Sequence, residues 1–93
     1  MISLLSKIPG RLLLATISGR VCWTAQGDLY RVHFPKSSVE YRPKTGDLGL
    51  LNYRGDCVAE IPARDLPANL GARIRDNVEV DRAATLADLF AHL

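Results

Sequence analysis

Short segments in which apolar and polar residues alternate follow one another closely between residues 12 and 61, and turn residues separate each segment from the next. None of the intervals between them is long enough for a parallel crossover, because such a connection takes about a dozen residues or more. Neighbouring segments must therefore pair antiparallel through tight turns. The spacing predicts a small barrel or sandwich of about five short strands.

The turn signals set the boundaries of the predicted strands. A first strand is predicted over residues 12–23, where Gly19 indicates a bulge or a bend. Further strands are predicted over residues 29–34, 39–42, 48–53 and 57–61. The phase of their alternation predicts that the following side chains line the core: Val21, Trp23, Tyr30, Val32, Phe34 and Tyr41.

The segments on either side of these strands are expected to form an arm and a mostly helical extension. In the arm, residues 1–10, Ile2, Leu5 and Ile8 share helical spacing, and Pro9-Gly10 is expected to end it. The barrel then spans residues 11–62 and the extension residues 63–93, all within a single domain 1–93. The predicted fold class is mainly β with short flanking helices (α+β), an OB-like or SH3-like five-stranded barrel with the C-terminal helix packed on it.

Three elements are predicted within the extension. Apolar residues spaced by four, Leu66, Leu70 and Ile74, indicate a helix from about Asp65, although Gly71 weakens it. Val78 and Val80 alternate with acidic residues and predict a short strand. A pair at the spacing of a capping box then predicts the start of a final helix. The cap residues are Thr85 and Asp88, and the apolar stripe that follows is Leu86, Leu89, Phe90 and Leu93.

The formal charge of +2 is unevenly distributed. Residues 1–54 carry eight Lys or Arg against three acids, a net of +5, whereas residues 55–93 carry a net of −3. A basic face on the polar side of the strands is one interpretation, and chance in a short chain is another. The candidate nucleic-acid contacts are Arg20, Arg31, His33, Arg42, Lys44 and Arg54. The aromatic side chains that would stack on bases are mostly expected in the core.

The motifs of catalytic and metal sites are missing from the sequence. It holds no glycine-rich phosphate loop, no H-E-x-x-H, no C-x-x-C and no G-x-S-x-G motif. His33 and His92 have no companion at metal-ligand spacing. We therefore expect a protein that is not an enzyme and has no metal or cofactor. No apolar run approaches the ~20 residues of a membrane span, so we expect a cytoplasmic protein without a membrane partner.

Cys22 and Cys57 lie too far apart for a metal knuckle or a redox pair. Two buried, reduced thiols are the plainest interpretation. A disulfide would require neighbouring strands, and a reactive thiol would require nearby positive charge. The sequence leaves these alternatives open.

The turn glycines carry a resemblance to known barrels. The residues concerned are Gly-Arg-Val-Cys-Trp at 19–23, Gly-Asp-Leu-Tyr-Arg-Val at 27–32, Thr-Gly-Asp-Leu-Gly-Leu-Leu at 45–51 and Gly-Asp-Cys-Val-Ala-Glu-Ile-Pro at 55–62. Their spacing resembles that of small OB-fold domains, namely the C-terminal domain of NfeD-like proteins and the barrel of bacterial translation initiation factor one. The resemblance implies an OB-like or SH3-like barrel and carries no functional residues over.

The leading functional hypothesis is a non-enzymatic protein-interaction module, such as an adaptor, an assembly factor, an inhibitor or a small subunit of a complex. Its partner would be another protein or a second copy of itself. The candidate contact residues are Ile2, Leu5 and Ile8 in the arm and Leu86, Leu89 and Phe90 at the other end. Nucleic-acid binding through the basic face is the alternative. A small ligand in the mouth of the barrel is a third hypothesis.

Overall fold

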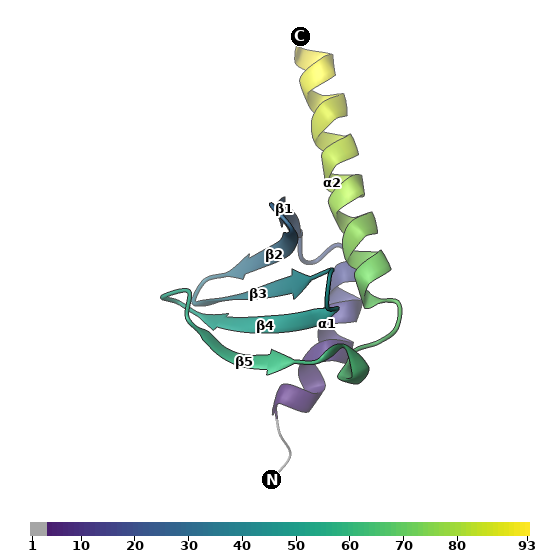
Figure 1. Ribbon diagram of the computed structural model, residues 1–93. Coiled ribbons are helices and arrows are strands. Elements are labelled where there is room, and N and C mark those ends of the chain that lie inside the picture. The colour runs from purple at the N-terminus through teal and green to yellow at the C-terminus, as the bar shows by residue number, and fades with distance from the viewer. Residues whose placement is uncertain (1–3) are drawn as a thin grey trace.

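Five antiparallel strands form one sheet in the order in which they occur along the chain (Figure 1). The structure is a computed structural model that describes residues 4–93. Its strands are β1 (Thr24–Gln26), β2 (Leu29–Phe34), β3 (Ser37–Arg42), β4 (Asp47–Asn52) and β5 (Cys57–Ile61). Its helical elements are η1 (Leu4–Lys7), α1 (Ile8–Ile17), η2 (Ala63–Asp65) and α2 (Leu70–His92).

The sheet confirms the predicted α+β class and the antiparallel pairing of neighbouring segments. β2, β3, β4 and β5 lie within two residues of their predicted boundaries. The register aligns Tyr30 with Tyr41, Tyr41 with Leu48 and Leu48 with Ile61, so one row of apolar side chains crosses four strands. Within residues 4–93 no pairing joins β1 to β5. The sheet is thus open, and closure into the predicted barrel is not shown.

The predicted strand over residues 12–23 was wrong, because α1 occupies its first half and a loop occupies the rest. Pro9 lies in the first turn of α1, where a missing N–H costs nothing, so it starts the helix instead of breaking the chain. Leu12 and Thr16, four residues apart, are both buried. The apolar run therefore has helical spacing toward the core. The expected arm over residues 1–10 is likewise part of this helix from Ile8 onward.

Gly19 ends α1 and does not form the predicted bulge. Its φ of 74° is left-handed, a conformation that glycine adopts without steric cost. The Gly19 amide donates to the Thr16 carbonyl at 3.3 Å and the Arg20 amide donates to the Ala15 carbonyl at 3.0 Å. These two bonds form a Schellman motif, which satisfies carbonyls at the helix end. The chain then turns back toward the sheet.

The core lies between one face of the sheet and the two helices. Trp23 is 1% exposed, and Leu48 and Ile74 are fully covered. The other buried apolar residues of this cluster are Leu12, Val32, Val39, Tyr41, Ile61 and Leu70. Among the predicted lining residues, Val21 and Tyr30 are half-buried against the cluster. Phe34 was predicted wrongly, since it lies at the end of β2 and is 39% exposed.

After η2, the C-terminal extension is one long helix and not the three predicted elements. η2 follows Pro62, and α2 begins at Leu70 instead of Asp65. The predicted strand at Val78 and Val80 and the predicted cap at Thr85 and Asp88 were wrong, because all four residues lie inside α2. Only Leu70 and Ile74 are buried within this helix. Its first turns complete the core, and the remainder extends past the sheet (Figure 1).

Candidate docking surface

The outer half of α2 stands clear of the rest of the molecule. Every residue from 79 to 93 is exposed, and the molecule measures 54 Å along its longest axis against 29 and 24 Å across. Leu86, Leu89, Phe90 and Leu93 recur at helical spacing and form one apolar stripe, which we call the tail stripe. Leu89 is 51% exposed and Phe90 is 85% exposed. Exposed apolar patches on proteins often mark interaction sites, so the tail stripe is the candidate docking surface of this molecule.

The predicted contact residues separate into two groups. Leu86, Leu89 and Phe90 lie together on the tail stripe. Ile2 falls outside the described residues, and the other two arm residues lie in different environments. Leu5, in η1, is 38% exposed, whereas Ile8 is half-buried against the core cluster. The structure therefore places the larger exposed apolar surface at the C-terminal end.

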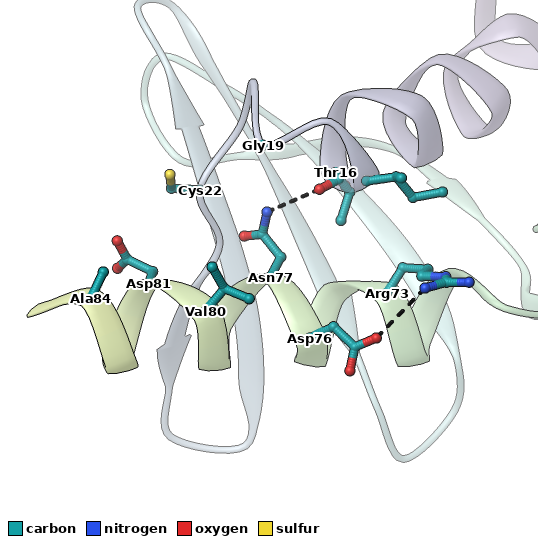
Figure 2. A pocket seen from close by; sticks show the side chains of 10 residues that line it. Thr16, Gly19, Cys22, Arg73, Asp76, Asn77, Val80, Asp81 and Ala84 are labelled. Atoms are coloured by element: carbon teal, nitrogen blue, oxygen red, sulfur yellow. Dashed lines mark hydrogen bonds and ion pairs between the residues drawn. The ribbon is translucent and has the colours of Figure 1, made fainter.

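Asn77 fixes the base of α2 to the loop that follows α1. Its Oδ1 accepts a hydrogen bond from the Trp23 amide at 2.8 Å. Its Nδ2 donates to the Val21 carbonyl at 2.9 Å and to the Thr16 carbonyl at 3.1 Å, and Figure 2 draws the second of these bonds. Trp23 Nε1 in turn donates to Thr16 Oγ1 at 2.9 Å. These bonds set the direction in which α2 leaves the sheet.

A groove of about 310 Å³ lies beside this contact, between the end of α1 and α2 (Figure 2). Ile17, Val80 and Ala84 form much of its apolar lining. Arg73 and Asp76, which pair at 3.8 Å, lie at its rim. The groove lies between two helices and is not the mouth of a barrel. It therefore does not support the hypothesis of a small ligand bound in a barrel mouth.

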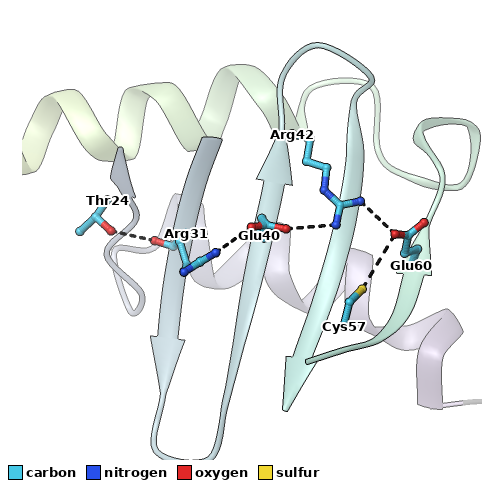
Figure 3. A network of polar contacts seen from close by, with 6 residues as sticks. All are labelled: Thr24, Arg31, Glu40, Arg42, Cys57 and Glu60. Atoms are coloured by element: carbon cyan, nitrogen blue, oxygen red, sulfur yellow. Dashed lines mark hydrogen bonds and ion pairs between the residues drawn. The ribbon is translucent and has the colours of Figure 1, made fainter. Parts of the chain in front are cut away.

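The outer face of the sheet carries a row of alternating charges from β2, β3 and β5, and the row passes over β4 (Figure 3). Glu40, whose side chain is 12% exposed, accepts a hydrogen bond from Arg31 Nη2 at 2.7 Å and another from Arg42 Nη2 at 3.0 Å. Arg42 Nη1 donates to Glu60 Oε1 at 3.1 Å. Gly49 makes room for this row, because a Cβ there would lie 2.8 Å from Arg42 Nη2. Arg31 and Arg42 are thus held by carboxylates, and this face has mixed charge.

The two arginines shift the ionisation of the carboxyl group between them. The pKa of Glu40 lies below its ordinary value, chiefly because Arg31 donates a hydrogen bond to the carboxylate. Burial alone would raise this pKa. The hydrogen bond and the positive charge of Arg42 help to outweigh the effect of burial. Burial alone would lower the pKa of Arg42, but its bonds to Glu60 and Glu40 raise it. Glu40 is therefore ionised in the folded protein to a lower pH than in the unfolded chain.

Replacement of Glu40 by Gln is expected to lower the free energy of unfolding at neutral pH by about 1–2 kcal/mol, because it removes a buried charge-assisted acceptor. Because the pKa of Glu40 is lower in the folded protein than in the unfolded chain, its ionised form stabilises the fold at pH values above the unfolded-state pKa. This contribution is lost as the pH falls through the folded-state pKa. Urea unfolding at several pH values should therefore show a smaller acid-side loss for Glu40→Gln than for the parent. Glu60→Gln, at a side chain 59% exposed, is the control and should change stability by less than about 0.5 kcal/mol. An equal loss in both variants would contradict the role given to Glu40.

The remaining predicted nucleic-acid contacts lie on several different elements. Lys44 pairs with Asp28 at 3.6 Å, and Arg54 pairs with Asp56 at 3.4 Å. Arg20 donates to the Ser18 hydroxyl, and His33 is exposed at the outer face of β2. Lys44 and Arg54 thus each have a carboxylate partner of their own.

Both cysteines are exposed free thiols, so the expectation of burial was wrong. Cys22 lies in the loop after α1, and the sheet in which it was expected to be buried does not include this segment. Cys57 lies at the start of β5, with its sulfur 3.9 Å from Glu60 Oε1 and 3.3 Å from the Ala59 carbonyl oxygen.

Three residues with clear structural roles escaped the sequence analysis. Asn77, Glu40 and Gly49 act through partners that are remote in the chain or on another strand, and nothing local in the sequence identifies those partners.

In the described part of the chain, no three His, Cys, Asp or Glu residues come together in a way that could hold a metal ion. None of the helices among residues 4–93 combines the length and the apolar character that a membrane crossing needs.

No known protein family, curated protein or solved structure matches this chain significantly. The resemblance to OB-fold barrels therefore stays a prediction.

Proposed function

We propose that this protein is a non-enzymatic protein-interaction module whose docking element is the outer half of α2. The observation that carries the proposal is the tail stripe, four large apolar side chains exposed along one side of a helix that nothing else in the described chain covers. The sheet and α1 serve as the base that holds this helix in place.

The energetics favour a covered tail stripe. Most helical stability in proteins comes from packing of an apolar face, and the apolar face of the outer half of α2 has no packing partner in the described chain. Burial of one Leu or Phe side chain contributes about 1.5–3 kcal/mol. A partner that covers the tail stripe would therefore gain affinity from Phe90 above all, because it is a large aromatic side chain that is 85% exposed in this structure.

The alternative, nucleic-acid binding, has less support from the charges. Arg31 and Arg42 would have to leave Glu40 before they could contact phosphates. A polyanion would also approach the carboxylates of Glu40 and Glu60 on the same face. The apolar character of the tail stripe instead suits a protein surface.

A photoreactive amino acid placed at Leu89 tests the proposal in the cells that make this protein. We expect irradiation to link position 89 to another polypeptide chain, because the partner would cover this side of α2. The same group at Lys36, in the turn between β2 and β3, is the control and should give no such product. A Phe90→Ser substitution should strongly reduce the product from position 89, since it removes the largest side chain of the contact.

Equal yields from positions 89 and 36 would contradict the docking role of the tail stripe. So would an unchanged yield in the Phe90→Ser variant. Because residues 79–93 make little contact with the core, these substitutions should leave the free energy of unfolding within about 0.5 kcal/mol of the parent. Circular dichroism and denaturation of each variant check this directly.

A further inference from the structure

We infer that the partner of the tail stripe is a different protein, one that encloses the outer half of α2 in a deep apolar groove with basic edges. The inference rests on the proposed function and adds the shape and the charge of the partner's binding site. Three observations carry it: the width of the apolar surface around α2, the groove into which that surface continues, and the charges that the helix presents.

The polar residues of the outer half of α2 are confined to one side of the helix. Between residues 83 and 93 only Thr85, Asp88 and His92 are polar, and Asp81, one turn before Thr85, continues their line. We call these four residues the polar stripe. With about 3.6 residues per turn, their side chains span roughly 60° of the helix circumference.

The apolar surface that remains is wider than a single contact face. The tail stripe is continued around the helix by a side that carries only alanines between residues 83 and 93, namely Ala83, Ala84, Ala87 and Ala91. Together the tail stripe and this alanine side cover roughly 220° of the circumference. A helix that packs on one surface needs an apolar stripe of roughly 100°. The observed width therefore fits a groove whose walls contact both sides of α2.

The alanine side leads into the groove between α1 and α2. Val80 and Ala84 line that groove (Figure 2), and Ile17, which is 54% exposed, contributes apolar surface from α1. The short side chains of the alanines let another helix approach closely, because the distance between packed helices depends on the side chains at their contact. A wall of the partner that follows the alanine side would thus end against α1.

The charges of the outer half favour a basic partner over a second copy of this chain. Residues 79–93 carry Glu79, Asp81 and Asp88 against Arg82, a net of −2 with His92 neutral. Within residues 4–93 Asp81 has no ion pair, and Asp88 has only His92 at 3.6 Å, with both of these side chains about three-quarters exposed. A second copy would bring a like net charge, whereas lysines or arginines along the edges of a groove would lie beside the polar stripe and attract its carboxylates.

A photoreactive diazirine amino acid, placed at one position of α2 at a time in the cells that make this protein, tests the enclosure. We expect position 89, on the tail stripe, and position 87, on the alanine side, to give the same cross-linked protein. Position 92, in the polar stripe, should give none. The linked peptides from positions 87 and 89 should come from two different segments of one partner chain, because the two positions contact opposite walls. Product from position 89 without product from position 87, or equal yields from all three positions, would overturn the enclosure.

Reversal of the charges tests the basic edges. Asp81→Lys combined with Asp88→Lys should reduce the yield from position 89 several-fold, because attraction to the edges becomes repulsion. Asp56→Lys, at an exposed position in the turn between β4 and β5, is the matched control and should leave the yield unchanged. Circular dichroism of each variant checks that the helix content stays that of the parent. An unchanged yield in the double variant, or an equal loss in the control, would overturn the basic edges.

The inference and the proposed function fail in different ways. If position 89 links to another copy of this chain, the basic partner is overturned and the docking function is retained. If position 89 links to no polypeptide at all, both proposals are overturned.

Discussion

Replacement of Asn77 by Ala is expected to lower the free energy of unfolding by about 3 kcal/mol, because three hydrogen bonds to main-chain groups disappear together. The Trp23 amide and the Val21 carbonyl would lose their partners, and both lie in a part-buried position. The Thr16 carbonyl would keep only its bond from the Gly19 amide. Water can enter the space left by the side chain and hydrogen-bond some of these main-chain groups. The expected loss of stability is therefore smaller than the cost of three unsatisfied buried groups.

Urea unfolding monitored by tryptophan fluorescence measures this loss directly, since Trp23 is the only tryptophan and is 1% exposed in the folded protein. Asn69→Ala is the matched control. Asn69 is the residue before α2, it is exposed, and its side chain makes no capping bond, so its replacement should change stability by less than about 0.5 kcal/mol. Similar losses in the two variants would show that Asn77 does not hold the base of α2.

Replacement of Gly71 by Ala is expected to destabilise the protein by about 2 kcal/mol, although the same change stabilises most helices. Gly71 lies in the first turn of α2, where the ring of Tyr41 packs against the helix backbone. A Cβ at this position would lie 3.0 Å from Tyr41 Cζ and closer still to the hydroxyl oxygen. Tyr41 is 8% exposed and has little room to move away. The helix would therefore have to shift from the sheet.

Gly10→Ala provides the opposite result within the same chain. Gly10 is a helical glycine of α1, and no atom would come within 4 Å of its added Cβ. We expect this change to stabilise the protein by about 0.5–1 kcal/mol. Thermal or urea unfolding of both variants should show shifts of opposite sign. The destabilisation by Gly71→Ala should also shrink in a Tyr41→Leu background, because residues in contact do not act additively. Equal stabilisation by the two alanines would contradict the close approach of Tyr41.

The sequence predicted the strands well wherever alternation and turn glycines agreed. β2 to β5 are short strands in which apolar residues alternate with others. The turn before β4 contains Gly46 and the turn before β5 contains Gly55, both at positive φ, and Pro35 and Lys36 form the turn between β2 and β3. These signals are local, so they can be identified without knowledge of the fold. Barrel closure is a property of the whole sheet, and no local pattern determines whether the edge strands meet.

The helices were harder to predict for physical reasons. In the run from Leu12 to Ile17 the apolar residues fit the spacing of a strand as well as that of a helix. Only the packing of this segment against α2 selects the helix. In α2, two valines with polar neighbours looked like a strand, and Thr85 with Asp88 looked like a cap. The tail stripe itself was predicted correctly as one apolar face. Its exposure could not be predicted, because it depends on where the sheet ends relative to the helix.

The polar contacts depended on positions that no local pattern reveals. Arg31 and Arg42 were predicted on the outer face of the sheet, where the structure has them, but their common partner Glu40 was not predicted. The register of β2 and β3 places Arg31 directly opposite Glu40, and a register of this kind follows from the paired strands as a whole. Asn77 lies 61 residues from Thr16 and 54 residues from Trp23, beyond any motif.

The order of the strands has a consequence for how the chain reaches this structure. Each strand pairs with the strand next to it in sequence, so the sheet has low contact order and can form early through closure of small loops. The contacts between α1 and α2 join opposite ends of the chain and require the largest loop to close. Interactions of this kind that form after the transition state slow unfolding and have little influence on the rate of folding. If the contacts between α1 and α2 form last, we expect substitutions there to change mainly the unfolding rate, and substitutions in the hairpins to change mainly the folding rate.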